Sequence, residues 1–250
     1  MIKSLKYYRQ RLPLLLWLMG WLLLFNTHTP YPPLRIAVDI GHSPKRTGAT
    51  SARGISEYHY NRSLGLKLQQ RLQQKGFDSF ILTAGNLEMG LKSRASLARI
   101  HADLLISIHH DSVQPQYLKT WVYHQQEQQY SDDFQGYSLF VSRLNPAYEA
   151  SYQYAQYLAQ ALYQQNLRPT LHHAEAISGE NRLLLDRRLG IYQYNNLVVV
   201  RESKIPAVLL ECGVLVNRQQ ELSLADEKSQ EIFIHAIIKA IQDYRKNQPK

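Results

Sequence analysis

Histidines and carboxylates stand at the points where predicted strands or helices meet their loops. The residues with this placement are His42, His109, His110, Glu57 and Glu211. Two histidines and one carboxylate are a common donor set of catalytic zinc sites, in which a fourth position stays open. A carboxylate at the start of a helix is also stabilised by the helix dipole without any metal. By residue type and spacing alone, a metal site and ordinary turn residues are about equally good explanations.

Alternating apolar patterns predict the elements that position these side chains. Strands are expected at 35–40, 77–82, 104–108, 118–123, 197–200 and 207–210, and helices at 57–75, 91–101, 147–165 and 227–245. The Gln-rich stretch 125–129 is expected to be a solvated loop. Because the central strands are apolar throughout, we expect an α/β fold in which a largely parallel twisted sheet has helices on both faces. Strand ends are where such folds gather active sites.

Charge and cysteine content exclude other classes of protein. The formal net charge is +9, but Lys3, Lys6, Arg9 and Arg11 precede any acidic residue, and the other basic residues are interspersed with acids. No dense basic tract occurs, so we expect no nucleic-acid partner. A mildly basic surface suits a carboxylate-rich cell wall instead. The single cysteine, Cys212, excludes an intramolecular disulfide and a Cys-rich zinc module.

The N-terminus has the pattern of an export signal. A basic stretch, 1–11, precedes an apolar run at 12–25, so residues 1–29 are predicted to be a signal peptide or signal anchor. The sequence 26–29 has no small-residue cleavage site, which leaves open whether the segment is removed. Residues 30–34 form a Pro-rich spacer. We therefore expect an exported protein of the periplasm or cell envelope, anchored to the cytoplasmic membrane by residues 12–25 if they are kept.

Four sequence blocks follow one another in the order of a known enzyme family. They are Val38-Asp39-Ile40-Gly41-His42, Gly54-Ile55-Ser56-Glu57 with Asn61, Ala102 to His109 preceded by Arg94, and Pro206 to Gly213 with Asn217 and Glu221. With these blocks the chain resembles the zinc-dependent N-acetylmuramoyl-L-alanine amidases over about residues 35–245. The resemblance implies a single catalytic domain at 35–250.

The resemblance also implies roles for individual residues. His42, Glu57 and His109 would bind Zn²⁺, and Glu211 would be the catalytic carboxylate. Three further residues would support these ligands or contact substrate: His110, Arg94 and Asn61. The loop 43–46 departs from the family because Ser-Pro-Lys-Arg replaces the usual glycines, which puts the shape of the loop beside His42 in doubt.

A long segment at about 124–190 is an insert relative to the minimal family pattern. It contains His172, His173, Glu175 and Glu180. Some family members carry an inserted helix whose glutamate plugs the zinc site until an activator protein removes it. Glu175 or Glu180 is a candidate for such autoinhibition, which would require an activator partner. The alternative is an insert that only shapes the substrate groove.

The expected reaction is hydrolysis of the amide bond between N-acetylmuramic acid and L-alanine in peptidoglycan, during wall remodelling or daughter-cell separation. Two alternatives stay open. The first is a zinc peptidase that cuts the peptidoglycan stem peptide, and the second is a non-catalytic peptidoglycan-binding module. Preserved ligands and a preserved catalytic carboxylate favour an enzyme over the binding module.

Overall fold

The computed structural model describes residues 34–83 and 88–248. The chain divides into two units, Met1–Pro32 and Pro33–Lys250, and the description here concerns the second. The predicted signal segment, 1–29, and most of the Pro-rich spacer lie outside the described residues. Among the helices that are described, none combines the length and the apolar character needed to cross a membrane.

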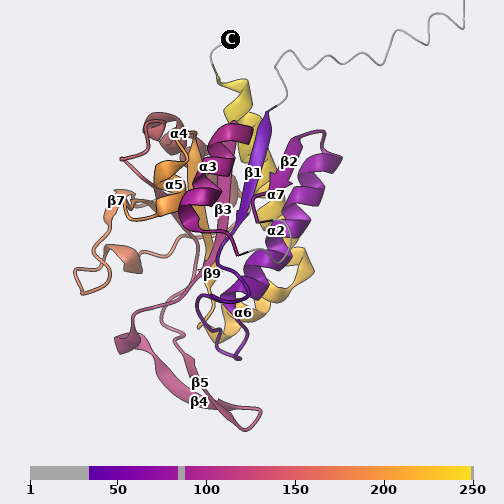
Figure 1. The fold of residues 1–250 in the computed structure, drawn as a ribbon. Helices are drawn as coiled ribbons and strands as arrows, with labels where there is room; N and C mark the ends of the chain where they lie inside the picture. Colours follow the sequence, from indigo (N-terminus) through magenta and orange to yellow (C-terminus); the bar gives the residue numbers. More distant parts are fainter. Residues whose placement is uncertain (1–33, 84–87, 249–250) are drawn as a thin grey trace, which may run out of the picture. The chain divides into compact units, whose positions relative to one another are not determined.

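A mixed sheet of seven strands forms the centre of the described unit (Figure 1). Its order is β2 (Asp78–Ile81), β1 (Arg35–Ile40), β3 (Leu104–Asp111), β9 (Ala207–Val214), β6 (Ser138–Val141), β8 (Ile191–Gln193) and β7 (Leu183–Asp186). The first four strands are parallel to one another. β6 is antiparallel to β9, β8 is parallel to β6, and β7 is antiparallel to β8. The prediction of a largely parallel sheet is confirmed.

Helices cover both faces of this sheet, as predicted (Figure 1). On one face the core contains side chains of α2 (Glu57–Gln74), α4 (Tyr148–Gln164) and α7 (Glu227–Lys246). On the other it contains side chains of α3 (Leu91–His101) and α5 (Val198–Glu202). A shorter helix, α6 (Arg218–Ala225), links β9 to α7. Apolar burial on both faces explains why the central strands read as continuous apolar runs.

A separate hairpin of β4 (Lys119–Tyr123) and β5 (Gln126–Tyr130) extends away from the main sheet (Figure 1). The indole of Trp121 donates a hydrogen bond to the carbonyl of Ala52 at 2.8 Å. The guanidinium of Arg218 lies 3.9 Å from the ring centre of Tyr130. The prediction of a loop over the Gln-rich stretch is wrong, because cross-strand pairing orders these exposed residues into β5.

Two further expectations need correction. Residues 197–200 were expected to form a strand, but α5 occupies most of this segment. Both edges of β9 are already paired, with β3 and β6, and Val199 and Val200 are buried against the α3 side of the sheet instead. The strands at 104–108 and 207–210 are also longer than expected, so His109 and Glu211 lie within β3 and β9 rather than in loops.

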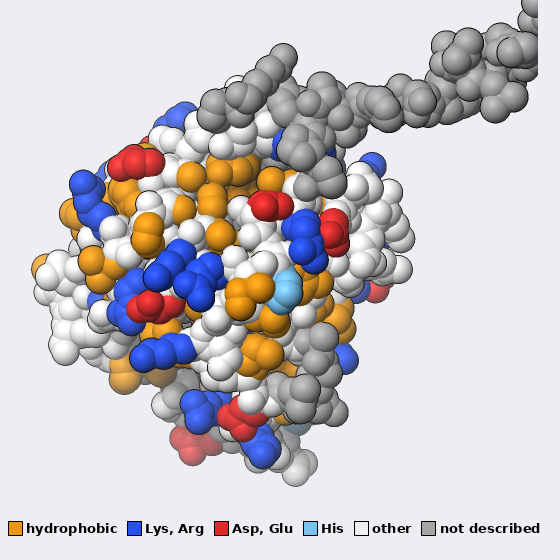
Figure 2. Space-filling view, turned by 45° about the horizontal axis from the view of Figure 1, so that its top comes forward, with side chains coloured by type: hydrophobic (Ala, Val, Ile, Leu, Met, Phe, Trp, Pro, Cys, Tyr) orange, Lys and Arg blue, Asp and Glu red, His pale blue; other side chains and the backbone are white. Residues whose placement is uncertain are grey.

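The surface of the described unit carries both signs of charge. On the face drawn in Figure 2, Lys and Arg side chains occur singly or in small groups, with acidic and apolar side chains between them. The charge on this face is therefore mixed rather than concentrated in one basic tract.

Candidate metal centre and active site

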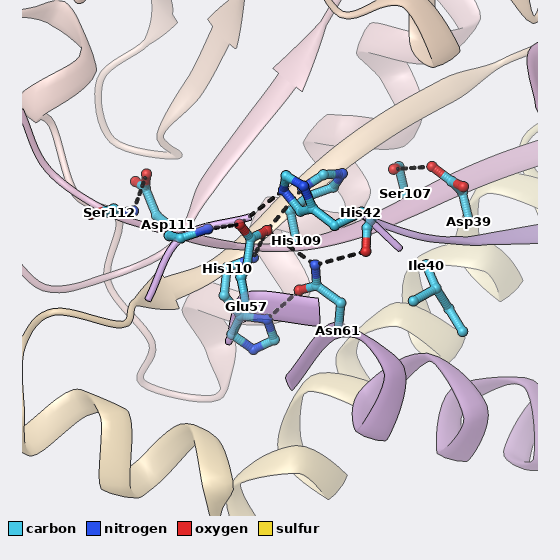
Figure 3. A network of polar contacts seen from close by, with 12 residues as sticks. Asp39, Ile40, His42, Glu57, Asn61, Ser107, His109, His110, Asp111 and Ser112 are labelled. Carbon is cyan, nitrogen blue, oxygen red and sulfur yellow. Dashed lines mark hydrogen bonds and ion pairs between the residues drawn. The ribbon is translucent and has the colours of Figure 1, made fainter. Parts of the chain in front are cut away.

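His42 follows β1 in a backbone conformation that a non-glycine residue rarely adopts, with φ at 68°. The buried guanidinium of Arg94, on α3, donates hydrogen bonds to the carbonyls of Ile40 at 2.9 Å and His42 at 2.5 Å. It also contacts the carboxylate of Asp39 at 3.2 Å. That carboxylate accepts a 2.6 Å hydrogen bond from the Ser107 hydroxyl (Figure 3). Arg94 thus fixes the end of β1 and the backbone that carries His42.

Glu57 is the first residue of α2, and its carboxylate faces both histidines (Figure 3). Its Oε2 lies 2.9 Å from Nε2 of His42, and its Oε1 lies 3.0 Å from Nδ1 of His109. The backbone N–H of Ala49 donates to Oε2 at 3.1 Å. The end of β1, the start of α2 and the end of β3 therefore bring three candidate ligands together.

The donor set fits a divalent metal ion. One ligand atom from each of His42, Glu57 and His109 can be chosen so that all three lie within 4.8 Å of one another. Two glycines leave room for this arrangement. A Cβ on Gly41 would lie 2.4 Å from the His109 ring, and one on Gly48 would lie 2.3 Å from Oε2 of Glu57. The chemistry of two imidazoles and one carboxylate is that of a catalytic zinc site with an open position.

The electrostatic environment keeps Glu57 ionised. Burial by itself would raise the pKa of its carboxyl, but hydrogen bonds and charge interactions with His109 and His42 outweigh burial. The net result is a pKa far below the ordinary value. A carboxylate that stays charged is suited to hold a cation.

Asn61 and His110 support Glu57 from behind (Figure 3). The Asn61 amide donates to Oε1 of Glu57 at 3.0 Å and to the Gly41 carbonyl at 3.2 Å. Its carbonyl oxygen lies 2.7 Å from Nδ1 of His110. Burial lowers the pKa of His110 to about 3, so its imidazole is neutral and Nδ1–H donates to Asn61. Both residues therefore lie behind the candidate ligand carboxylate, where they fix its orientation.

Glu211 lies beside the candidate ligands. It is the register partner of His109 in the neighbouring parallel strand and of Ser138 in β6. Its Oε2 is buried and has no hydrogen-bond partner among residues 34–83 and 88–248. Burial raises the pKa of this carboxyl well above its ordinary value, and the charges of Asp111 and Glu57 raise it further. A carboxyl with a raised pKa, next to a candidate metal site, suits proton transfer near neutral pH.

A cleft of about 540 Å³ opens on the α3 and α5 side of the sheet, with both candidate histidine ligands in its wall. Its lining includes His42, His109, Arg94, Leu91, Leu197 and Val200. Arg46, in the loop where the sequence departs from the family, also lines the cleft and pairs with Glu88 at 3.3 Å. The cleft therefore gives a ligand direct access to His42 and His109, two of the three candidate metal ligands.

The two candidate autoinhibitory glutamates have other partners within the described residues. Glu175 accepts a 2.7 Å hydrogen bond from the Tyr117 hydroxyl. Glu180 lies 2.9 Å from Nδ1 of His173 and accepts a 2.7 Å hydrogen bond from the Gln114 amide. Two of these contacts join the inserted segment to residues 114 and 117, the third lies within the segment, and autoinhibition stays a prediction.

Sequence reasoning did not single out Gly48 or Ser107. Gly48 has a φ of 76° and leaves space for the Glu57 carboxylate, but an isolated glycine gives no sign of which side chain will approach it. Ser107 lies in a matching block, yet its bond to Asp39 becomes evident only when β1 and β3 pair in register.

An α/β sheet with two histidines and two glutamates brought together at one end, and with both histidines in the wall of a cleft, defines a candidate metal-dependent hydrolase. A family model described as Amidase_3, N-acetylmuramoyl-L-alanine amidase, matches residues 36–243. The chain belongs to this family, which confirms the predicted resemblance.

The comparisons with individual proteins agree with this assignment. LytH of Staphylococcus aureus, a probable cell wall amidase, is 24% identical over 237 residues, which cover 91% of this chain and 66% of LytH. The chain therefore spans just under two thirds of that relative's length.

Three solved amidases share the fold. The catalytic domain of CwlV from Bacillus (Paenibacillus) polymyxa var. colistinus is 25% identical, with a TM-score of 0.63 over 86% of this chain and 99% of that domain. An amidase from Clostridium difficile 630 is 24% identical, with a TM-score of 0.66 over 87% and 99%. CwlD from Clostridioides difficile, solved in complex with the GerS lipoprotein, is 18% identical, with a TM-score of 0.63 over 86% and 100%.

Proposed function

We propose that this protein is a zinc-dependent enzyme that hydrolyses the amide bond between N-acetylmuramic acid and L-alanine in peptidoglycan. Membership of the amidase family supports the bond and the substrate. The observation that carries the proposal is the position of Glu211, a half-buried residue that is in register with the candidate ligand His109 and whose Oε2 is buried. A proton-transfer group and a candidate metal site thus lie together at one end of the sheet.

The ligand residues and the catalytic carboxyl have separate tasks. His42 through Nε2, His109 through Nδ1 and Glu57 through its carboxylate would hold Zn²⁺. When bound, Zn²⁺ supplies Lewis acidity towards a carbonyl oxygen and lowers the pKa of water. Glu211 would accept a proton from the attacking water and then deliver it to the leaving amine of L-alanine. Its buried Oε2 has no competing hydrogen-bond partner among the described residues.

The cleft beside His42 and His109 would receive the substrate. Leu91, Leu197 and Val200 supply apolar wall, whereas Arg46 supplies a cation at the rim. An exposed arginine of this kind would attract the carboxylates of the stem peptide. Its neighbour Lys45 lies 4.0 Å from Glu88 and is also exposed. The loop 43–46 would therefore contribute to recognition of acidic wall polymer.

The proposal is tested with the full-length chain in a mild detergent, loaded with zinc and incubated with purified peptidoglycan. Mass spectrometry of the products is expected to find free stem peptides with a new N-terminal L-alanine and peptide-free glycan. The activity should be lost on chelation and restored by zinc. The Glu211→Gln variant controls for contaminating hydrolases, and Glu149→Gln, an exposed position on α4, controls for the substitution itself.

Two other outcomes would replace this proposal. Fragments that are cut within the stem peptide would identify a peptidase. Retention on peptidoglycan without any product, from a zinc-loaded chain, would identify either a binding module or an inhibited enzyme. Variants in which Glu175 and Glu180 are both replaced by glutamine would then separate those two cases, because only an inhibited enzyme gains activity.

The site of action and the regulation are further parts of the proposal. The N-terminal sequence supports export to the periplasm or cell envelope, with residues 12–25 as an anchor if they are kept.

The CwlD amidase, solved with the GerS lipoprotein, supports an activator or partner protein for a chain of this fold. Activity that rises when Glu175 or Glu180 is replaced by glutamine would support autoinhibition, and unchanged activity would remove it.

A further inference from the structure

A second group of metal-binding side chains lies at the same end of the sheet. Asp111 ends β3, two residues beyond His109, while His172 and His173 belong to a short 3₁₀ helix of the inserted segment. These three side chains are buried, with exposed fractions of 9%, 2% and 8%. We propose that Asp111, His172 and His173 bind a second divalent metal ion, and that zinc is the ion they fit. This inference does not rest on the amidase activity.

The spacing of the donor atoms suits a zinc ion. Oδ2 of Asp111 lies 2.8 Å from Nε2 of His173 and 3.2 Å from Nε2 of His172. One donor atom from each residue lies within 4.8 Å of the other two. Ligands about 2.0–2.2 Å from a tetrahedral ion are roughly 3.3–3.5 Å apart. The three donors are therefore close to the positions that an ion between them would require.

Hydrogen bonds orient each of these side chains towards the others. Nδ1 of His172 lies 2.8 Å from the Thr170 hydroxyl, and Nδ1 of His173 lies 2.9 Å from the Glu180 carboxylate. Oδ1 of Asp111 accepts a 2.8 Å hydrogen bond from the Ser112 backbone N–H (Figure 3), and Oδ2 faces the two histidines. Metal-binding histidines typically use their second nitrogen in this way, which fixes the tautomer and the ring.

Without a metal ion, Nε2 of His172 has an ion-pair contact but no well-directed hydrogen bond. Its Nε2 is buried and makes no hydrogen bond within the described residues, although it lies 3.2 Å from Oδ2 of Asp111. A buried nitrogen without a well-directed hydrogen bond is costly. The same cluster contains two carboxylates, those of Asp111 and Glu180. A divalent cation beside two neutral imidazoles would balance their negative charge. A cation among the three donors would give Nε2 of His172 a partner and would neutralise the charge of the two carboxylates.

The second site would fasten the inserted segment to the strand that carries a catalytic ligand. His172 and His173 are about 60 positions from Asp111 in the sequence, and the ion would link their segment directly to β3. Phe140 of β6 and Phe134 pack against the two histidine rings, with ring centres 4.9 and 5.2 Å away. This apolar surround limits access of water to the cluster. We therefore assign the ion a structural task and His172 and His173 the role of its ligands.

The test is the zinc content of the full-length chain after titration with Zn²⁺ and removal of unbound metal, measured by mass spectrometry of the metal. The wild-type chain is expected to bind two zinc ions. His172→Ala/His173→Ala should bind one, and His42→Ala/His109→Ala, which removes two ligands of the other site, should also bind one. His235→Ala, an exposed histidine on α7, is the matched control and should bind two.

If the His172→Ala/His173→Ala variant does not fold, the His42→Ala/His109→Ala variant still tests the proposal, because it retains only the second site. A folded His42→Ala/His109→Ala chain that binds no zinc would overturn the proposal. So would a wild-type chain that binds one zinc and loses it in the His42→Ala/His109→Ala variant, because Asp111, His172 and His173 would then hold no ion. Cobalt replacing zinc gives an independent readout: absorption bands from two sites are expected in the wild type and from one in each variant.

Discussion

His109 of β3 and Glu211 of β9 are register partners in adjacent parallel strands. Partners in neighbouring strands carry their side chains on the same face of the sheet. A candidate metal ligand and a candidate proton carrier are therefore placed side by side by backbone hydrogen bonding, rather than by flexible loops. Glu57 completes the set from α2, through its 3.0 Å contact with Nδ1 of His109.

Replacing Glu211 by glutamine should abolish turnover and leave the metal site intact. The amide has the size of the carboxyl but cannot exchange a proton, so we expect turnover to fall by about 10²–10⁴-fold. Zinc content should equal that of the wild type, because no hydrogen bond or ion pair within the described part of the chain joins Glu211 to the three candidate ligands. Product release and metal content are measured on the same samples, with Glu149→Gln as control. Turnover within a few-fold of wild type would remove Glu211 from the catalytic role.

Replacing Asn61 by alanine should weaken zinc binding at the first site. Glu57 would lose the 3.0 Å hydrogen bond from the amide, and His110 would lose its 2.7 Å partner. Loss of a group that orients a metal ligand typically costs about 10–100-fold in metal affinity. The affinity is measured by competition with a chelator of known strength. Gln70→Ala, an exposed position on the same helix, should leave the affinity unchanged, and equal affinities for both variants would contradict this role of Asn61.

Much of the site could be predicted because its residues occupy local sequence patterns. His42, His109 and Glu211 each follow an apolar strand pattern, and Glu57 opens an amphipathic helix, so their meeting at one end of the sheet follows from parallel topology. The family resemblance then separated ligands from ordinary turn residues. The side of the sheet on which the site lies, and the atoms that make contact, such as Nδ1 of His109, could be learned only from the three-dimensional structure. Both depend on the register in which the strands pair.

The inserted segment and the residues that follow it show where sequence reasoning stops. Val198, Val199 and Val200 favour a strand by intrinsic preference, but α5 forms because β9 has no free edge and the valines are buried beside α3. Likewise, the contact of Asp111 with His173 spans 62 positions. No periodic pattern links residues so far apart, since their distance depends on the path of the whole insert.

Replacing Asn217 by alanine should destabilise the fold without changing the zinc content. Asn217 caps α6 by accepting hydrogen bonds from the backbone N–H groups of Gln219 and Gln220. Its amide also donates to the Phe134 carbonyl at 3.0 Å. Loss of an N-cap costs about 0.5–2 kcal/mol, so the free energy of unfolding in urea should fall by that amount. Gln219→Ala leaves the cap in place and should have less than half of this effect.

Replacing Arg94 by methionine should be the most destabilising change near the site. Arg94 and Asp39 are both buried, with exposed fractions of 3% and 1%. Removal of the guanidinium would leave the Asp39 carboxylate buried without its counter-ion, which typically costs about 3–5 kcal/mol. The carbonyls of Ile40 and His42 would lose their donor as well. Urea unfolding measures the loss, and Arg99→Met, exposed on the same helix, is the matched control.

Arg94→Lys separates the charge from the shape of the guanidinium. A lysine ammonium restores the counter-ion of Asp39, but it lacks the planar fork that reaches two carbonyls as well. We therefore expect Arg94→Lys to recover part of the stability but to bind zinc more weakly than the wild type, because the backbone of His42 is no longer held by a short hydrogen bond. If Arg94→Met matched Arg99→Met in stability, the Asp39 carboxylate would have to be neutral or solvated, and the rigid end of β1 would need another cause.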